Sequence, residues 1–290
     1  MTVCARRGSL ATLLVFGLVL SLAFTAPATA SAARSLTDRN CSLIPPLKAA
    51  APIGNAACSG VRPGALIESD AGSCTMNYVF RGSDRRRYVG TAGHCVIEAP
   101  STGGDFPERR WAPGAGPVAR DGSGKRIGRF AYAVLRDSDE ADFALVRLDP
   151  GVASNPQMCH FGGPTKLDSR RPGPFPPTLL SHFGNGILVG NLGVVNRTTL
   201  PARTALALGM PSARHVYAQG LVVPGDSGSA INSAGGGAVG VVVTTGVHSA
   251  SIGRGGIDAG LVGIVRIVPM MQRAARFTGT TYTLQTAPRI

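Results

Sequence analysis

Acidic residues are scarce in this chain of 290 residues. Asp and Glu together number 16 against 29 Lys and Arg, which gives a net charge of +13. Aromatic residues are also few, at 6% of the chain, and Trp111 is the single tryptophan. An excess of basic charge favours acidic polymers or an anionic cell envelope as partners, although a basic, solvated surface is the simpler explanation. No nucleic-acid-binding motif accompanies the charge and few rings are available for stacking, so we expect no nucleic-acid partner.

Long apolar runs are absent after the first 30 residues. Residues 10–24 form an apolar run that follows Arg6 and Arg7 and precedes small residues ending at Ala30, which is the layout of a secretory signal peptide. About 15 apolar residues fall short of the roughly 20 needed to span a bilayer. We therefore predict a signal peptide over residues 1–30, a secreted, extracellular protein, and no stable membrane insertion once the signal is removed.

The sequence has no Cys-x-x-Cys or His-x-x-x-His pattern, which argues against a metal site. We expect neither a metal nor an organic cofactor. Cys4 lies in the predicted signal peptide, which leaves five of the six cysteines in the mature chain. Export permits disulfides, and Cys159 is expected to pair with either Cys58 or Cys41.

Strong helix formers are sparse, whereas glycine (39) and proline (21) are abundant. Short runs rich in Val, Ile and Thr alternate with turn residues, a pattern typical of an all-β protein. The clearest predicted strands are residues 129–134, 143–148, 187–190, 216–218 and 238–243. Residues 172–177 are rich in proline, which lacks the amide donor of a strand ladder, so we place a linker there.

Three short motifs carry the candidate chemistry: TAGHC at residues 91–95, ADFALV at 141–146 and GDSGS at 225–229. A serine hydroxyl such as that of Ser227 is a weak nucleophile and needs a nearby base. His94 would be that base and then the acid that protonates the leaving amine. Asp142 directly precedes an apolar run, so its carboxylate would lie at the start of a buried strand and orient the imidazole. The other nearby aspartates lie in what are predicted to be solvated turns.

With these three motifs in this order, residues 61–268 resemble the secreted serine proteases of the trypsin/chymotrypsin class, in particular the bacterial streptogrisin-like members. The resemblance implies an all-β fold with two six-stranded antiparallel β-barrels, an active site between them and a short C-terminal helix at 268–277. It also implies a Cys74–Cys95 disulfide. The predicted organisation after the signal peptide is an N-terminal arm or short propeptide (31–60), the first barrel (61–169), a linker (170–178), and the second barrel with the C-terminal segment (179–290).

The resemblance further implies that the backbone N–H groups of Gly225 and Ser227 form an oxyanion hole. Asp226 between them is expected to form a buried ion pair, either with a new amino terminus or with an arginine.

The substrate-binding residues follow from the same resemblance. Leu221, beside Val222, would form the base of the specificity pocket, and an apolar base favours apolar side chains. Asp258 would favour basic side chains instead if its carboxylate entered the pocket. Thr244, Thr245 and Gly246 would pair with an extended substrate as an added strand. Val223 occupies the position of a common family cysteine, which leaves substrate preference less defined than the reaction.

The predicted function is therefore a monomeric, secreted serine endopeptidase that acts on protein or peptide substrates and prefers apolar residues before the scissile bond. One alternative is a non-catalytic relative that binds a protein or polymer of the cell envelope. Another is an esterase, but an α/β-hydrolase would carry Gly-x-Ser-x-Gly with its histidine last, whereas here the histidine comes first.

Overall fold

The computed structural model describes residues 58–97, 106, 108–136, 140–186, 201–222, 224–245 and 261–290, without the side chains of 244 and 245. The predicted signal peptide, most of the predicted arm, Cys41 and the predicted strand at 187–190 lie outside these residues. Within the described ranges, no helix has both the length and the apolar character needed to cross a membrane.

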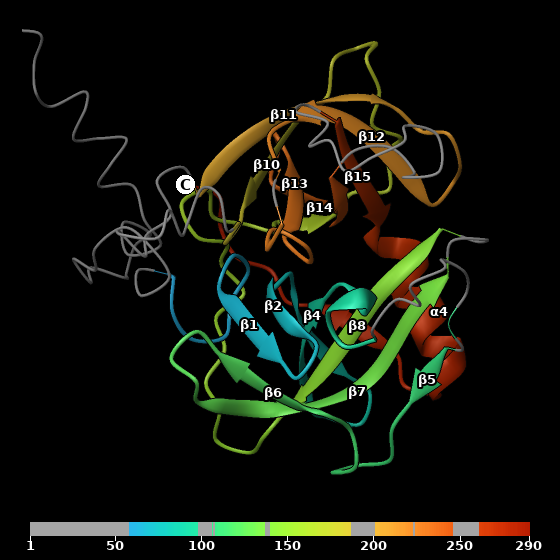
Figure 1. Cartoon of the computed structure of the whole chain (residues 1–290). Coiled ribbons are helices and arrows are strands. Elements are labelled where there is room, and N and C mark those ends of the chain that lie inside the picture. Colours follow the sequence, from blue (N-terminus) through green and yellow to red (C-terminus); the bar gives the residue numbers. More distant parts are fainter. Residues whose placement is uncertain are drawn as a thin grey trace, which may run out of the picture. The chain divides into compact units, whose positions relative to one another are not determined.

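The first sheet contains the strands before residue 150 and one strand from the C-terminal end (lower half of Figure 1). Its order is β16-β3-β4-β8-β7-β6-β1-β2, with β5 paired to β7. The strands are β1 (Leu66–Ser69), β2 (Gly72–Thr75), β3 (Val79–Gly82), β4 (Arg87–Thr91), β5 (Arg109–Arg110), β6 (Val118–Asp121), β7 (Arg126–Arg136), β8 (Ala141–Leu148) and β16 (Tyr282–Leu284).

β2 and β3 follow one another in the chain but lie near opposite ends of the strand order. The sheet therefore bends back on itself where the chain runs from β2 to β3. Between them, the N–H of Met76 donates to the carbonyl of Ala65 and the N–H of Asn77 donates to that of Gly90. The chain therefore passes from pairing with β1 to pairing with β4 as one bent strand.

The second sheet forms a closed ring of six strands (upper half of Figure 1). The ring runs β13-β10-β11-β12-β15-β14 and closes because β13 also pairs with β14, while β9 adds to β14 in parallel. These strands are β9 (Lys166–Leu167), β10 (Leu179–Phe183), β11 (Ala202–Gly209), β12 (His215–Gly220), β13 (Ala230–Ser233), β14 (Gly237–Thr245) and β15 (Leu261–Arg266).

The burial pattern explains why these sequences form strands. In β11, buried and exposed residues alternate along ARTALALG, because successive side chains of a strand point to opposite faces of the sheet. One core contains the largest buried rings, including Phe80, Phe130 and Phe143, and the other is aliphatic, with Val216 and Ile231. The predicted all-β class is confirmed.

The predicted C-terminal helix is also confirmed, as α4 (Ile267–Thr278). It ends at Gly279, whose φ of 73° is the left-handed conformation typical of a helix C-terminus. The chain then returns to the first sheet, where β16 pairs antiparallel with β3. This last strand was not predicted from the sequence.

Candidate active site

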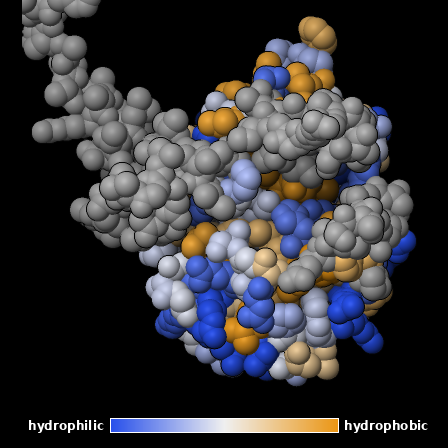
Figure 2. All heavy atoms as spheres, in the orientation of Figure 1, coloured by the Kyte–Doolittle hydropathy of each residue, from blue (hydrophilic) through white to orange (hydrophobic). Residues whose placement is uncertain are grey.

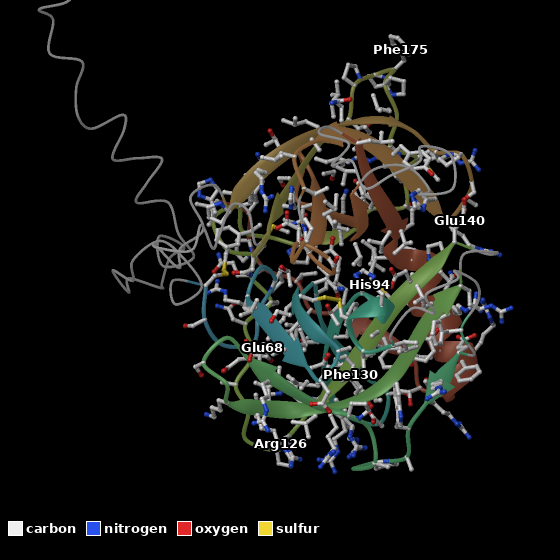
Figure 3. All side chains as sticks on the ribbon, in the orientation of Figure 1. Glu68, His94, Arg126, Phe130, Glu140 and Phe175 are labelled. Atoms are coloured by element: carbon white, nitrogen blue, oxygen red, sulfur yellow. A yellow bond between two sulfur atoms is a disulfide. The ribbon has the colours of Figure 1, made fainter. Side chains whose placement is uncertain are left out.

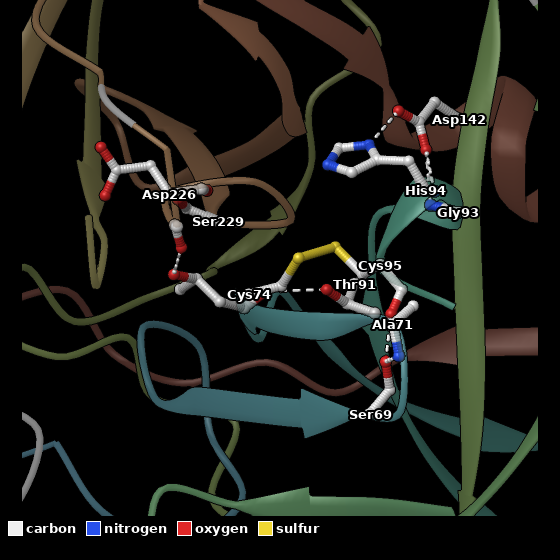
Figure 4. Close-up of a disulfide and its surroundings, with 12 residues drawn as sticks. Ser69, Ala71, Cys74, Thr91, Gly93, His94, Cys95, Asp142, Asp226 and Ser229 are labelled. Atoms are coloured by element: carbon white, nitrogen blue, oxygen red, sulfur yellow. Dashed lines mark hydrogen bonds and ion pairs between the residues drawn. A yellow bond between two sulfur atoms is a disulfide. The ribbon is translucent and has the colours of Figure 1, made fainter. Parts of the chain in front are cut away.

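His94 and Asp142 lie in direct contact. His94 is part of a short 3-10 helix, η2 (Gly93–Cys95), which follows β4, and Asp142 is the second residue of β8. The His94 Nδ1 and one carboxylate oxygen of Asp142 are 2.7 Å apart, and the other carboxylate oxygen accepts the backbone N–H groups of Gly93 and His94 (Figure 4). Asp142 therefore holds both the imidazole ring and the turn that carries it.

The environment of His94 sets its basicity. Burial lowers the pKa of the imidazole, but the charge of Asp142 and its hydrogen bond raise it by more, so the pKa lies above the ordinary value of 6.5. The ring keeps 30% of its surface exposed, whereas the Asp142 side chain keeps 12%. A partly open imidazole with its Nδ1 bound to a carboxylate leaves Nε2 as the nitrogen that is available for proton transfer.

The loop that carries Ser227 packs against the β2–β4 region. The carbonyl of Ser227 accepts the N–H of Thr75, and the N–H of Gly228 donates to the carbonyl of Val242. Gly225 and Gly228 have φ values of 99° and 90°, which L-residues with a side chain rarely adopt. A Cβ on Gly228 would also lie 2.3 Å from the carbonyl oxygen of Thr75.

Thr75 connects this loop to both sheets. Its hydroxyl donates to the carbonyl of Gly225 at 2.8 Å and accepts the N–H of Asn185 at 3.0 Å. Its own carbonyl accepts the hydroxyl of Thr91, the last residue of β4, at 3.0 Å. The side chain is fully buried. One residue thus bonds to the Ser227 loop, to the segment that leads to His94 and to the segment that follows β10.

The backbone N–H groups of Gly225 and Ser227 have no hydrogen-bond partner within the described part of the chain. The N–H groups of the next two residues are bonded to the carbonyls of Val242 and Asp226. The loop therefore keeps two donors available on either side of Asp226, as the predicted oxyanion hole requires.

Asp226 forms its ion pair with an arginine, which resolves the alternative left open by the sequence. Both terminal nitrogens of Arg203, on β11, donate to the two carboxylate oxygens at 2.6 Å. The side chains are 6% and 0% exposed, respectively. Because the ion pair comes from within the second sheet, the carboxylate does not depend on a new amino terminus.

His182 is a buried histidine beside this ion pair. Burial and the positive charge of Arg203 lower its pKa to about 3, so the ring is neutral at ordinary pH. It packs inside the second sheet on β10.

Two disulfides lie within the described residues. Cys74 pairs with Cys95, as the resemblance implied, and links β2 to the residue that follows His94 (Figure 4). Cys159 pairs with Cys58 rather than with Cys41. Cys74, His94 and Cys95 also form a group with metal-ligand spacing, but both sulfurs are in the disulfide and neither is the thiolate that a metal requires.

The predicted substrate-binding residues are only partly described. Leu221 is 39% exposed and Val222 is buried in the aliphatic core. Thr244 and Thr245 pair with Gly263 and Val262 of β15, while β13 pairs with β14 only as far as Val241. The side chains of Thr244 and Thr245, and the whole of Val223, Gly246 and Asp258, lie outside the described residues.

Sequence reasoning missed two residues that shape this site, Thr75 and Arg203. One feature of the sequence could have pointed to Thr75, because it directly follows Cys74, which was predicted to form the disulfide next to His94. No feature of the sequence could have pointed to Arg203, because it is one arginine of many in a chain with few acidic residues.

No protein-family model matches the sequence, and no curated protein matches it. Solved structures similar to this chain include the chymotrypsin of Cellulomonas bogoriensis, with 16% identity, a TM-score of 0.48, and coverage of 78% of this chain and 99% of that one. A Nocardiopsis protease has 15% identity and a TM-score of 0.48 over 77% and 98% of the two chains. A homolog of α-lytic protease named N4 has 18% identity and a TM-score of 0.43 over 76% and 98%.

Proposed function

We propose that this chain is a secreted serine endopeptidase in which Ser227 attacks the scissile carbonyl and His94 takes its proton. The observation that carries the proposal is the contact of Asp142 with the His94 Nδ1, at 2.7 Å, together with the bonds that hold the His94 turn. This arrangement fixes the tautomer in which Nε2 accepts a proton.

The reaction would proceed through an acyl-enzyme. As the Ser227 oxygen bonds to the carbonyl carbon, the proton passes to His94, and the negative charge on the carbonyl oxygen is stabilised by the N–H groups of Gly225 and Ser227. His94 then returns the proton to the leaving amine, and water repeats the attack on the ester. Loss of one such oxyanion donor lowers the rate by about 100- to 1000-fold in enzymes of this mechanism.

An extended substrate would add to the edge of β14. At Thr244 and Thr245 one edge of this strand pairs with β15, while pairing with β13 has ended at Val241. The described residues place no strand on that second edge, so main-chain groups remain there for a peptide, as in β-augmentation. The exposed side chain of Leu221 supports a preference for apolar residues before the scissile bond.

The test is labelling of the secreted protein with a fluorophosphonate, measured by intact mass. We expect one adduct in the wild type and none in Ser227→Ala, and cleavage of peptides with Phe before the scissile bond faster than of matched peptides with Lys. Absence of an adduct on folded protein would contradict the proposal and favour the non-catalytic binding protein. Labelling combined with cleavage of simple esters but not of peptides would favour an esterase.

A further inference from the structure

A concave site lies in the first sheet, away from the candidate active site. It is a cavity of about 390 Å³, within the range of small-ligand pockets. Tyr88, Arg129 and Arg147, from β4, β7 and β8, contribute to its lining, together with residues 110–114 and the segment from Thr278 to Tyr282. The chain end after α4 thus forms part of the cavity.

This cavity is separate from the candidate active site. Asp142 lies near the start of β8, and Arg147 lies five residues further along the same strand. At about 3.3 Å per residue, the two positions are roughly 17 Å apart. In Figure 3, Phe130 of β7, another lining residue, lies below His94 in the lower part of the first sheet. Figure 2 shows hydrophilic side chains gathered over this lower part on the visible face.

Arginines dominate the charge of the cavity. Arg129 and Arg147 are directly opposed across β7 and β8, and like charges in this position destabilise a sheet. Arg129 donates to the carbonyl of Gly116 at 2.8 Å. The side chains of Arg147 and Arg110 have no ion pair or hydrogen bond within the described part of the chain.

The single acid of the lining, Asp84, offsets only part of the charge of the three arginines. Asp84 accepts the hydroxyl of Tyr88 at 2.6 Å and the backbone N–H of Arg86 at 3.0 Å. Its carboxylate is thus oriented by neutral donors and forms no ion pair with a lining arginine within the described residues, so guanidinium groups remain that match the geometry of an oxyanion.

Aromatic rings form part of the remaining wall. Tyr88 and Tyr282 pack edge to face with ring centroids 5.1 Å apart, and the partly buried Trp111 also lines the cavity. A ligand that fills the cavity therefore needs both an anionic group for the arginines and a ring or apolar body for these side chains.

We infer that this cavity binds an oxyanion, a carboxylate, sulfate or phosphate, carried on a ring-shaped or apolar body. The bound anion lies between Arg110, Arg129 and Arg147 and removes the repulsion between the opposed pair. The inference is independent of the proposed peptidase activity.

Trp111 makes the test specific, because it is the only tryptophan of the chain and lines the cavity. The tryptophan fluorescence of the full-length secreted protein is followed while a ligand is added. The charged ligands are a sulfated disaccharide and a disaccharide that carries a carboxylate instead. The controls are the same sugar in neutral form and sodium sulfate at equal ionic strength. We expect a saturable change with one or both charged sugars, and a much weaker response to the neutral sugar and to the free anion.

Arg147→Gln is the decisive variant, and Arg120→Gln, an exposed arginine of the same sheet outside the lining, is its charge-matched control. We expect about tenfold or more weaker binding in Arg147→Gln and unchanged binding in Arg120→Gln. The thermal midpoint of Arg147→Gln without ligand should equal or exceed that of the wild type, because the opposed charges are gone. Equal weakening in both variants, equal binding of the neutral sugar, or no saturable change would each overturn the inference.

Discussion

At the scale of single residues, the buried Thr75 does not only pack in the core but also forms hydrogen bonds to the loop that carries Ser227. Its hydroxyl fixes the orientation of the peptide at Gly225, and its backbone fixes that of Ser227. These two fixed peptides, 225–226 and 227–228, flank the Asp226–Ser227 peptide that carries the Ser227 N–H, so they restrict where that N–H points. Thr75 is therefore a positioning residue for the predicted oxyanion hole rather than a catalytic residue.

We predict that Thr75→Val lowers kcat about tenfold or more, with little change in KM, because a hydrogen bond to Gly225 is lost and the N–H of Asn185 is left unpaired. Each lost bond should lower the free energy of unfolding by about 1 kcal/mol. Thr75→Ser retains the hydroxyl and should restore most of the rate. Equal loss of rate in both variants would show that packing of the methyl group, and not the hydrogen bond, matters.

The pH dependence of activity should follow His94. The base must be neutral, so kcat/KM should rise with pH through a pKa that lies above 6.5. In Asp142→Asn the charge that raises this pKa is removed and burial continues to lower it, so the acid limb should move to lower pH. The rate itself should fall by about 10⁴-fold, because the tautomer is no longer fixed. Profiles of kcat/KM between pH 4 and 9 test this, and an acid limb at the same pH in both proteins would contradict it.

At the scale of elements, the loop that bears Ser227 is held by strands on several sides. β2 binds it through Thr75, β14 through Val242, and β11 through the Arg203–Asp226 ion pair. A loop in an unusual backbone conformation persists only where its surroundings over-determine it. Breaking the ion pair should be costly, because it would leave one charge buried without its partner.

Arg203→Met should therefore lower the free energy of unfolding by about 3–5 kcal/mol, since it leaves the buried carboxylate of Asp226 without its guanidinium partner. Arg126→Met is the matched control, because the Arg126–Asp149 pair is 45% and 35% exposed and should contribute less than about 1 kcal/mol. Urea unfolding measures both. Adding Asp226→Asn to Arg203→Met should recover part of the lost stability, and a further loss in the double variant would contradict this account.

At the scale of the whole molecule, the C-terminal end ties the fold together. After the second sheet is complete, α4 and β16 carry the chain back to β3 of the first sheet. Arg273 of α4 also forms an ion pair with Glu108, at 2.9 Å. The first sheet therefore receives a strand from the far end of the sequence, a contact that forms only after a long loop is closed.

We predict that Tyr282→Ala, in β16, lowers the free energy of unfolding by about 3–5 kcal/mol, because a large buried ring is lost from its contact with Tyr88. Thr283→Ala, whose side chain is exposed on the same strand, should change stability by less than about 0.5 kcal/mol. Similar melting temperatures for the two variants would mean that β16 is dispensable for the first sheet.

Local patterns in the sequence were sufficient to predict the all-β class, while the resemblance carried by the three motifs implied the C-terminal helix and the Cys74–Cys95 disulfide. They also singled out His94 and Asp142, which the structure brings into contact, and Ser227, whose role remains a prediction. These features rest on alternation, turn residues and short motifs, whose physical causes act between near neighbours along the chain.

The tertiary structure alone decided which groups distant in sequence meet. Arg203 as the partner of Asp226, Thr75 as the link to Gly225, Cys58 as the partner of Cys159, and β16 on β3 all depend on how strands pair across long stretches of chain. The pairing register of the strands is set by the burial of whole sheet faces. A local sequence pattern therefore does not indicate which arginine will lie beside a buried carboxylate, or which hydroxyl beside a buried carbonyl. The arginine-lined cavity has the same origin, because residues from strands and loops far apart in the sequence converge there only after both the first sheet and the C-terminal segment have folded.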